Sequence, residues 1–345
     1  MPTLEDIARR AGVSGATVSN VLRKRGTVST ATIAKVQQVA RELGYRPNLV
    51  ARALAERRSP TIAVFFTNIL NPFYPQFAFA AERAARRRDH FLLVCNAATP
   101  EGTLDTAYLD AVAGTLAEGL IVLGSDLGGQ SLLAMLPPGV PVVLSTWEET
   151  NMYPTVPCVT VDFHQAGKLS GAHLVELGHR RIGIIAGTEH PEIIGSVSHH
   201  ARLAGLRESL EAHGITVLPP RLQLEPDSIE GGRLAANRLL DLDPTVTAIA
   251  ATNDLLAIGV LQAAAERQLR VPEMLSVIGL TDIWMSAQVR PALTTIDIAT
   301  VALADGSVNL LLDLIDDPAR VPTSALRVVG TPVLIRRAST GPPSN

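Results

Sequence analysis

Beyond residue 60, short apolar runs alternate with amphipathic stretches of helical period. The pattern predicts nine strands, at residues 61–66, 91–96, 119–124, 140–146, 156–162, 181–187, 221–225, 248–252 and 276–279. It predicts helices between them, including residues 76–88, 165–177, 202–213, 231–242 and 255–267. Strands that alternate with helices form parallel sheets with right-handed crossovers. Nine of them fit two doubly wound lobes better than one, and a ligand would bind at the carboxyl ends of the strands, between the lobes.

The N-terminal part shows a different pattern, of short helices separated by tight turns. Thr3 and Asp6 form a capping signal for a first helix, and Gly12 supplies the positive φ of a tight turn. Ser14 can cap a second helix, and a third helix is predicted from Ser29 to about Leu43. Positions in register reproduce the pattern of a DNA-binding helix-turn-helix: Ala8, Gly12, Val13, Val18 and Val21. The alternative is an ordinary αα-corner in a helical bundle.

Length and composition narrow the class of protein. The 345 residues exceed one ordinary domain, and 47% hydrophobic residues can bury a sizeable core, which excludes general disorder. The longest apolar runs, such as residues 62–66, are far shorter than the ~18–20 residues needed to cross a bilayer. Charged residues near the N-terminus are unlike a signal peptide, and Cys95 and Cys158 fit reduced core positions. We therefore expect a soluble, cytoplasmic protein that does not enter a membrane.

The net charge of −3 hides a division along the chain. Residues 1–60 contain eleven Lys and Arg but only four Asp and Glu, for a net charge of +7, whereas the remainder carries −10. A small basic head on a larger acidic body indicates that the head, and not the body, meets a polyanion. A basic helical face that is only solvated is the alternative.

Residues 3–54 resemble the headpiece of the LacI-type bacterial transcriptional regulators. The resemblance is carried by Asp6-Ile7-Ala8, Ala11-Gly12-Val13-Ser14, Ala16-Thr17-Val18-Ser19, Leu43-Gly44-Tyr45-Arg46-Pro47-Asn48 and Ala51-Arg52-Ala53-Leu54. The body resembles the same family, which shares its fold with periplasmic binding proteins, at residues 71–74, 118–121, 177–182, 202–206, 252–259 and 290–296. The implied fold is α plus α/β: a helix-turn-helix headpiece with a hinge helix, then a two-lobed body of doubly wound parallel sheets.

The resemblance also implies domain boundaries. The headpiece would span residues 1–46, the hinge helix and linker 47–60, and the effector-binding and dimerisation body 61–345. Lobe one is expected at about 61–161 and 292–322, and lobe two at about 162–291 and 323–340. The chain would therefore cross between the lobes near Asp162, Arg290 and Pro322.

In the family, the second helix lies in the major groove of DNA, which assigns base reading here to Gly15, Ala16 and Asn20. Gly15 has no side chain to read with, and Ala16 can touch only a thymine methyl group. Asn20 can pair with adenine through two hydrogen bonds. Many relatives carry Arg at this last position, so Asn20 departs from the guanine contact that an Arg favours.

Other headpiece residues are expected to contact the DNA without reading its sequence. The resemblance assigns phosphate contacts to Ser14, Thr17 and Ser19. Residues 48–55 resemble the hinge helix, which is too short to be stable alone and orders when two copies pair on the operator. Leu54 would wedge into a minor-groove step and bend the duplex, and an apolar contact with the body is the alternative. The expected DNA-binding set is completed by Thr3, Asn48 and Ala51.

Body residues that match the family's effector contacts are Phe73, Tyr74, Trp147, Asp162, Arg202, Asn253 and Thr281. Core packing is the alternative for Phe73 and Tyr74, and an interlobe salt bridge is the alternative for Arg202. Thr281 follows Gly279-Leu280, and Thr146 precedes Trp147, where sugar-binding relatives usually carry Asp. The loss of two carboxylates while Arg202 is kept weakens the case for a neutral sugar and favours an anionic metabolite.

The sequence shows no recognisable catalytic constellation. Gly167-Lys168-Leu169-Ser170 lacks the preceding glycine of a phosphate loop, and no nucleophile–base pair has a recognisable setting. The loop at residues 188–201 is longer than usual in the family, and its histidines fit solvated side chains better than a metal site: His190, His199 and His200. We expect no cofactor.

We therefore predict a non-enzymatic, sequence-specific DNA-binding regulator that acts as a repressor. It would bind a near-palindromic operator as a homodimer, or as a tetramer, because one recognition helix reads too few bases. A small polar metabolite bound between the lobes would control the operator affinity. The alternative is a cytoplasmic small-molecule-binding protein or α/β enzyme with an accessory DNA-binding head. A transporter's solute-binding protein would need an export signal and no such head.

Overall fold

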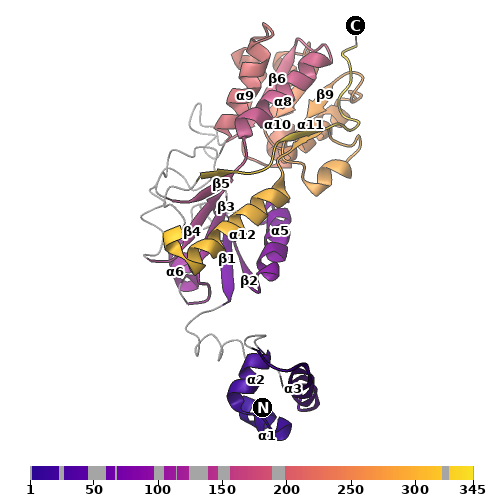
Figure 1. The fold of residues 1–345 in the computed structure, drawn as a ribbon. Coiled ribbons are helices and arrows are strands. Elements are labelled where there is room, and N and C mark those ends of the chain that lie inside the picture. Colours follow the sequence, from indigo (N-terminus) through magenta and orange to yellow (C-terminus); the bar gives the residue numbers. More distant parts are fainter. Residues whose placement is uncertain are drawn as a thin grey trace. The chain divides into compact units, whose positions relative to one another are not determined.

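The computed structural model describes residues 2–22, 27–45, 60–66, 68–96, 105–113, 115–123, 139–146, 156–188, 199–320 and 326–344. The chain divides into two compact units, residues 1–59 and 60–345 (Figure 1). The predicted hinge helix, with Asn48, Ala51 and Leu54, lies outside the described residues, as does Trp147.

The N-terminal unit contains helices α1 (Leu4–Ala11), α2 (Gly15–Leu22) and α3 (Thr30–Glu42). Their apolar positions meet in one small core, in which Ile7, Ala11, Val18 and Val36 are completely buried. The three helices predicted from the sequence are therefore confirmed, and so is the inward side of each.

Lobe one of the body is built on a parallel sheet with strand order β11-β5-β4-β3-β1-β2. Its strands are β1 (Thr61–Phe66), β2 (Phe91–Asn96), β3 (Leu120–Leu123), β4 (Val142–Ser145), β5 (Cys158–Thr160) and β11 (Leu326–Val328). Helices α5 (Phe73–Arg87) and α12 (Thr300–Asp316) pack together on one face, and α6 (Thr106–Val112) packs on the other. Because both faces are covered, alternate residues of β1 enter two separate apolar clusters.

Lobe two has a smaller parallel sheet with strand order β7-β6-β8-β9. Its strands are β6 (Ile182–Gly187), β7 (Leu222–Glu225), β8 (Ala248–Ala251) and β9 (Ser276–Ile278). Its helices are α8 (Phe163–Glu176), α9 (His200–Glu211), α10 (Ile229–Leu242) and α11 (Asp254–Glu266). The pair α8–α9 covers one face of the sheet and the pair α10–α11 covers the other.

The first crossover lies near Asp162, as expected, between β5 of lobe one and α8 of lobe two, whereas the second and third lie later in the chain than expected. Strand β11 pairs with β5 in lobe one, so the segment assigned to lobe two from residue 323 returns there only after Val328. Strand β10 (Thr295–Asp297) pairs with β12 (Val333–Ile335), and Thr294 and Asp297 bridge to Ile278 and Thr281 of lobe two. Lobe two therefore extends past residue 291. The sequence did not predict the short strands β10, β11 and β12.

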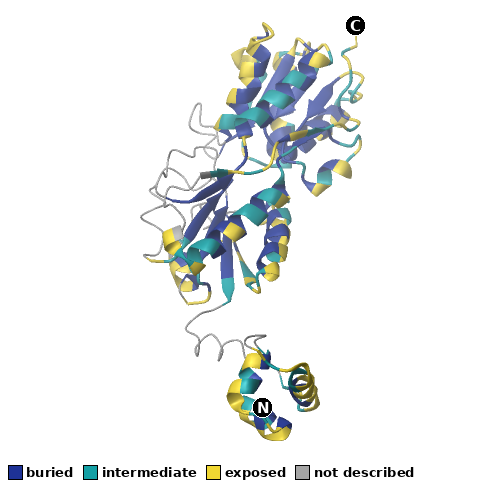
Figure 2. Cartoon of the chain, in the orientation of Figure 1, coloured by how far each residue is buried: buried dark blue, intermediate teal, exposed yellow. Residues whose placement is uncertain are grey.

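The inner strands of both sheets are buried, whereas the edge strands β2 and β7 and the outer faces of the helices are partly exposed (Figure 2). The doubly wound, two-lobed body predicted from the sequence is therefore confirmed. Among the described helices, none combines the length and the apolar character needed to cross a bilayer.

Candidate nucleic-acid interface and effector site

Helix α1 begins with reciprocal hydrogen bonds between Thr3 and Asp6. The Asp6 backbone N–H donates to Thr3 Oγ1 (3.3 Å), and the backbone N–H and hydroxyl of Thr3 donate to Asp6 Oδ2 (2.9 and 2.8 Å). The bonds from Thr3, with the nearby charge of Arg9, lower the pKa of the Asp6 carboxyl below its ordinary value. The predicted capping signal is confirmed, and a DNA contact of Thr3 stays a prediction.

The turn between α1 and α2 depends on Gly12, whose φ of 66° lies in the left-handed region. The backbone N–H groups of Gly12 and Val13 both donate to the Ala8 carbonyl oxygen. Ser14 Oγ then accepts from the Thr17 backbone N–H at 3.1 Å, which opens α2. This local geometry sets the direction of α2 relative to α1.

Helix α2 separates its buried and exposed positions. Val18 and Val21 are buried, whereas Gly15, Ala16 and Asn20 are exposed. The Asn20 amide carries the donor and the acceptor that two bonds to one base edge require. The structure thus brings the three residues predicted to read bases onto the exposed side of one helix.

The predicted phosphate contacts on α2 are partly used within the protein. Ser14 Oγ lies 2.9 Å from Thr17 Oγ1, so these two hydroxyls share a hydrogen bond at the start of the helix. Thr17 and Ser19 are half-buried. Phosphate contacts of these three residues stay a prediction.

Phe73 and Tyr74 open helix α5 but have different surroundings. Tyr74 is buried, and its ring stacks on that of Phe66 with 5.2 Å between the centroids. Phe73 is half-buried and contacts two apolar clusters, one within lobe two and one that spans both lobes. Tyr74 therefore has the contacts of a core residue, whereas Phe73 lies where the lobes meet.

Arg202 of α9 is buried at the carboxyl end of strand β8. Its guanidinium lies 4.6 Å from the centroid of the Phe163 ring, and its Nη1 donates to the Thr252 carbonyl oxygen at 3.0 Å. Both of these contacts lie within lobe two, and the interlobe salt bridge considered above stays an alternative. A positive charge is thus held at the end of the sheet where ligands of doubly wound folds bind.

Asn253 is the first residue of the turn that leads into α11. Its Oδ1 accepts from the Leu256 backbone N–H at 2.9 Å and caps the helix. Its Nδ2 is buried and has no hydrogen-bond partner among the described residues. A buried amide donor without an acceptor costs free energy, which a bound acceptor would recover.

Thr281 and Asp162 have roles in local structure. The Thr281 hydroxyl lies 3.5 Å from Asp254 Oδ2, and its backbone φ is 122°. Asp162 is exposed and caps α8 by accepting from the Gln165 backbone N–H at 2.8 Å. Effector contacts of both residues stay predictions.

A polar cluster around Thr252 was not predicted from the sequence, and the expectation that His199 is solvated is wrong, because His199 is buried in this cluster. His199 Nε2 lies 3.0 Å from Asp227 Oδ2, and His199 Nδ1 lies 3.0 Å from Thr252 Oγ1. Thr252 Oγ1 also accepts from the Gly187 backbone N–H at 3.1 Å. Gly187 ends β6, Asp227 follows β7 and Thr252 follows β8. The one signal in the sequence that could have predicted this cluster is the shared position of these residues at the carboxyl ends of parallel strands. Within the described part of the chain, no group of His, Cys, Asp and Glu is arranged to hold a metal ion.

The segment compared above with a phosphate loop lies inside helix α8. A Cβ atom at Gly167 would lie 2.0 Å from the Arg202 carbonyl oxygen, so this glycine permits the close approach of α9. Ser170 Oγ donates to the Ala166 carbonyl oxygen (3.5 Å). The segment serves helix packing.

Both units of the chain match known protein families. Residues 3–48 match the family of bacterial regulatory proteins, lacI family, and residues 172–340 match the periplasmic binding protein-like domain. The HTH-type transcriptional repressor PurR of Haemophilus influenzae (strain PittEE) is 32% identical over 343 residues, which cover 98% of each chain. The ribose operon repressor of Escherichia coli (strain K12) is 30% identical, over 98% of this chain and 100% of the repressor.

The fold is also found among solved structures. The lac repressor dimer bound to operator and the anti-inducer ONPF superposes with a TM-score of 0.79 at 28% identity, over 99% of both chains. Full-length similarity to transcriptional repressors joins the helix-turn-helix and the two-lobed body in one chain. The protein belongs to the lacI family of bacterial regulatory proteins and is a DNA-binding transcriptional repressor.

Proposed function

We propose that this repressor reads its operator through Gly15, Ala16 and Asn20 of α2, and that a small polar metabolite bound between the lobes sets its operator affinity. The observation that carries the proposal is the division of α2 into buried valines and an exposed face that presents the Asn20 amide. Buried Val18 and Val21 anchor the helix, so its other side is available to a DNA groove.

Two copies of the chain would act together on a near-palindromic site. One short helix contacts too few base pairs to discriminate an operator among bulk DNA, and a twofold dimer doubles the number of contacts. The similar lac repressor structure is a dimer bound to operator. Support also comes from the basic character of the N-terminal segment, which favours approach to phosphate.

The effector would be an anionic, hydroxylated metabolite such as a sugar acid or a phosphorylated sugar. Arg202 supplies a positive charge beside Thr252, and the adjacent Asn253 presents a buried amide donor that has no acceptor among the described residues. A carboxylate or phosphate oxygen accepts hydrogen bonds from both groups. Asp227 Oδ1, which is buried without a partner among the described residues, could accept from a ligand hydroxyl.

Catalysis has no part in this proposal. The similar proteins named above are regulators. The glycine of the phosphate-loop-like segment is used for packing α8 against α9. Binding alone is sufficient for a repressor that switches between two populations of conformers.

Selection of duplexes from a random DNA library by the full-length protein tests the DNA-binding part. The expected result is a near-palindromic consensus whose half-sites lose specificity at one position in the Asn20→Ala variant. No enrichment of any sequence, with or without metabolites, would contradict the proposal.

A thermal-shift screen of neutral sugars, sugar acids and phosphorylated sugars tests the effector part. The expected result is stabilisation by an anionic compound that is lost in the Arg202→Ala variant. Stabilisation by a neutral sugar that survives in Arg202→Ala would overturn the anionic assignment and leave the DNA-binding part intact.

A further inference from the structure

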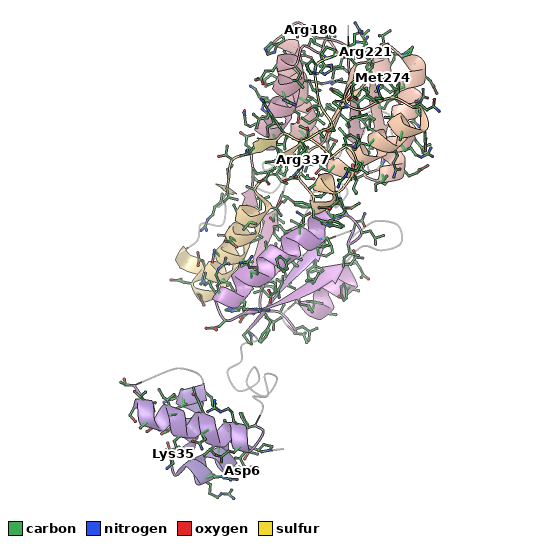
Figure 3. All side chains as sticks on the ribbon, turned by 90° about the vertical axis from the view of Figure 1, so that its right-hand side faces the viewer. Asp6, Lys35, Arg180, Arg221, Met274 and Arg337 are labelled. Atoms are coloured by element: carbon green, nitrogen blue, oxygen red, sulfur yellow. The ribbon has the colours of Figure 1, made fainter. Side chains whose placement is uncertain are left out.

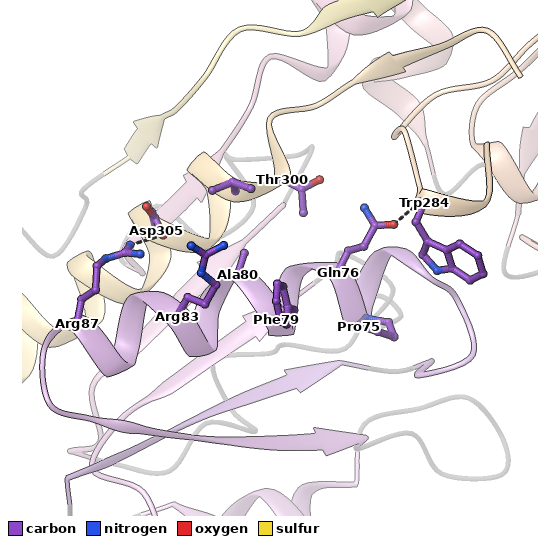
Figure 4. A pocket seen from close by; sticks show the side chains of 10 residues that line it. Pro75, Gln76, Phe79, Ala80, Arg83, Arg87, Trp284, Thr300 and Asp305 are labelled. Atoms are coloured by element: carbon purple, nitrogen blue, oxygen red, sulfur yellow. Dashed lines mark hydrogen bonds and ion pairs between the residues drawn. The ribbon is translucent and has the colours of Figure 1, made fainter. Parts of the chain in front are cut away.

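Gln76 of α5 in lobe one holds the backbone of a segment in lobe two. Its Oε1 accepts from the Trp284 backbone N–H at 2.6 Å (Figure 4), and its Nε2 donates to the Asp282 carbonyl oxygen at 3.5 Å. The first of these bonds is short and the second is at the limit of a hydrogen bond, so the Trp284 contact dominates. One side chain thus joins the two lobes.

The segment that Gln76 holds, residues 281–286, has an unusual backbone. Thr281 and Asp282 have φ values of 122° and 52°, in the left-handed region that residues with a Cβ atom rarely adopt. Such a conformation persists only where surrounding contacts impose it. A change in those contacts would therefore move the segment.

The contacts that impose this conformation converge on Asp254. Its Oδ2 accepts from the Ile283 backbone N–H (2.9 Å) and the Ser286 hydroxyl (2.8 Å), and its Oδ1 accepts from the Thr295 hydroxyl (2.6 Å). Asp254 is completely buried, and Arg337, labelled in Figure 3, adds an ion pair with Asp282 at 2.7 Å. A fixed carboxylate thus determines the path of the segment.

The same carboxylate is adjacent to two candidate effector residues. Asp254 directly follows Asn253, and its Oδ2 lies 3.5 Å from the Thr281 hydroxyl. On α5, Phe73 lies one turn before Gln76, on the same side of the helix, and contacts the apolar cluster of lobe two. The path from the candidate effector residues to Gln76 is therefore continuous.

The surroundings of Trp284 leave room for a shift. A pocket of about 460 Å³ lies beside the Gln76 contact, and its lining includes Phe79, Trp284 and Val301 (Figure 4). Trp284 is 60% exposed. The Trp284 side chain can therefore shift into this space, whereas Ile283 and Ser286 of the same segment are buried.

We propose that the Gln76–Trp284 contact couples effector occupancy in lobe two to the position of α5 in lobe one. A ligand at Asn253 and Thr281 would alter the Asp254-held segment, and Gln76 would pass that change to α5. Gln76 does not touch the ligand, so it is a positioning residue. The inference rests on the proposed function, because it takes the effector to bind at these residues, and coupling of this kind is reciprocal between ligand and DNA.

Three variants of the full-length protein test the coupling. Gln76→Leu removes both hydrogen bonds with little change in volume, and Gln76→Glu keeps the acceptor for Trp284. Gln262→Leu, at an exposed position of α11, is the matched control. Residue-resolved amide exchange is the first readout. The Trp284 amide should exchange about three- to tenfold faster in Gln76→Leu only, whereas the Ile283 amide, held by Asp254, should be unchanged.

Affinity for a duplex that the wild-type protein selects is the second readout. Its Kd should change about three- to tenfold in Gln76→Leu and stay unchanged in Gln76→Glu and Gln262→Leu. An unchanged Kd together with faster Trp284 exchange would show that the contact is only structural, and this overturns the inference. If Trp284 amide exchange is unchanged in Gln76→Leu, the inference is also wrong, because the contact does not hold the segment. If the wild-type protein selects no duplex, the proposed function is wrong, and the inference is wrong as well. This outcome is distinguishable from the others, because it is seen with the wild-type protein alone.

Discussion

A Cβ atom on Gly205 would lie 1.9 Å from the carbonyl oxygen of His164, so helix α9 approaches α8 more closely than any side chain at position 205 permits. The reverse contact, from Gly167 to the Arg202 carbonyl oxygen, is equally close at 2.0 Å. Arg202 lies one turn before Gly205 on α9. The close contact of the two helices therefore also places the guanidinium that we assign to the effector site.

Gly205→Ala should destabilise the body by about 3 kcal/mol, because the obstacle is backbone that cannot rotate away and the two helices must separate. Urea unfolding followed by far-UV circular dichroism measures this change. Separation of α8 from α9 should also weaken effector stabilisation through the displaced Arg202.

Gly306→Ala is the matched control for this substitution. Gly306 also lies within a helix, but its added Cβ would meet methyl groups of Val159 and Val329, at 3.0 and 3.3 Å. Those side chains can shift, and alanine favours the helix, so the cost should stay below about 1 kcal/mol. Equal costs for the two variants would contradict the account of the α8–α9 contact.

The body should lose stability as the pH falls below about 7, because buried His173 and His179 are kept neutral. Burial lowers the pKa of both imidazoles from 6.5, and Arg336 lowers that of His173 further. The unfolded chain then binds more protons than the folded one as the pH passes down through 6.5, so the free energy of unfolding decreases. His90 opposes this trend, because its bond to Glu118 raises its pKa and adds stability that is lost at higher pH.

His179→Gln should flatten this dependence by up to about 1.4 kcal/mol per pH unit. The measurement is urea unfolding at pH 5, 6, 7 and 8. His213→Gln, at an exposed position, is the control and should leave the slope unchanged. A His179→Gln protein with the wild-type slope would show that His179 does not contribute to acid sensitivity.

Asn20→Arg should change which base the protein prefers at one symmetric position. An Arg on the exposed face of α2 would favour guanine O6 and N7, whereas Asn20 favours adenine, with about 1–3 kcal/mol of discrimination. Binding selections with both proteins measure the change. Gln37→Arg, at an exposed position of α3, adds the same charge and should leave the consensus unaltered. A consensus that is identical for wild type and Asn20→Arg would remove Asn20 from base reading.

Leu54→Ala should reduce both the operator bend and the specific affinity, if Leu54 wedges into a minor-groove step as its family position predicts. Leu54 lies outside the described residues, so this prediction depends on the sequence. Gel-shift bend analysis with the selected duplex measures the angle. An unchanged bend angle would favour the apolar contact with the body instead.

Features that lie within one helix or turn could be predicted from the sequence. The capping residues Thr3 and Ser14, the turn at Gly12 and the inward side of α2 follow from local periodicity and local hydrogen bonds. The alternation of strands and helices likewise predicted two doubly wound lobes. These features need no knowledge of which distant segments meet.

Features that depend on contacts between distant segments could not be predicted from the sequence. The late third crossover follows from the pairing of β11 with β5, which lie more than 160 residues apart in the chain. The contact of Gln76 with Trp284 spans 208 residues, and nothing in the sequence around either residue marks it. Tyr74 shows the same limit, because an aromatic residue at a family ligand position is here stacked on Phe66.

If α2 reads a specific duplex, the full-length protein must distinguish its selected duplex from a scrambled duplex of equal length. Fluorescence anisotropy at physiological salt measures the Kd for both. We expect the selected duplex to bind at least about 10³-fold more tightly. Equal affinity for both duplexes, with or without the stabilising metabolite, would contradict it.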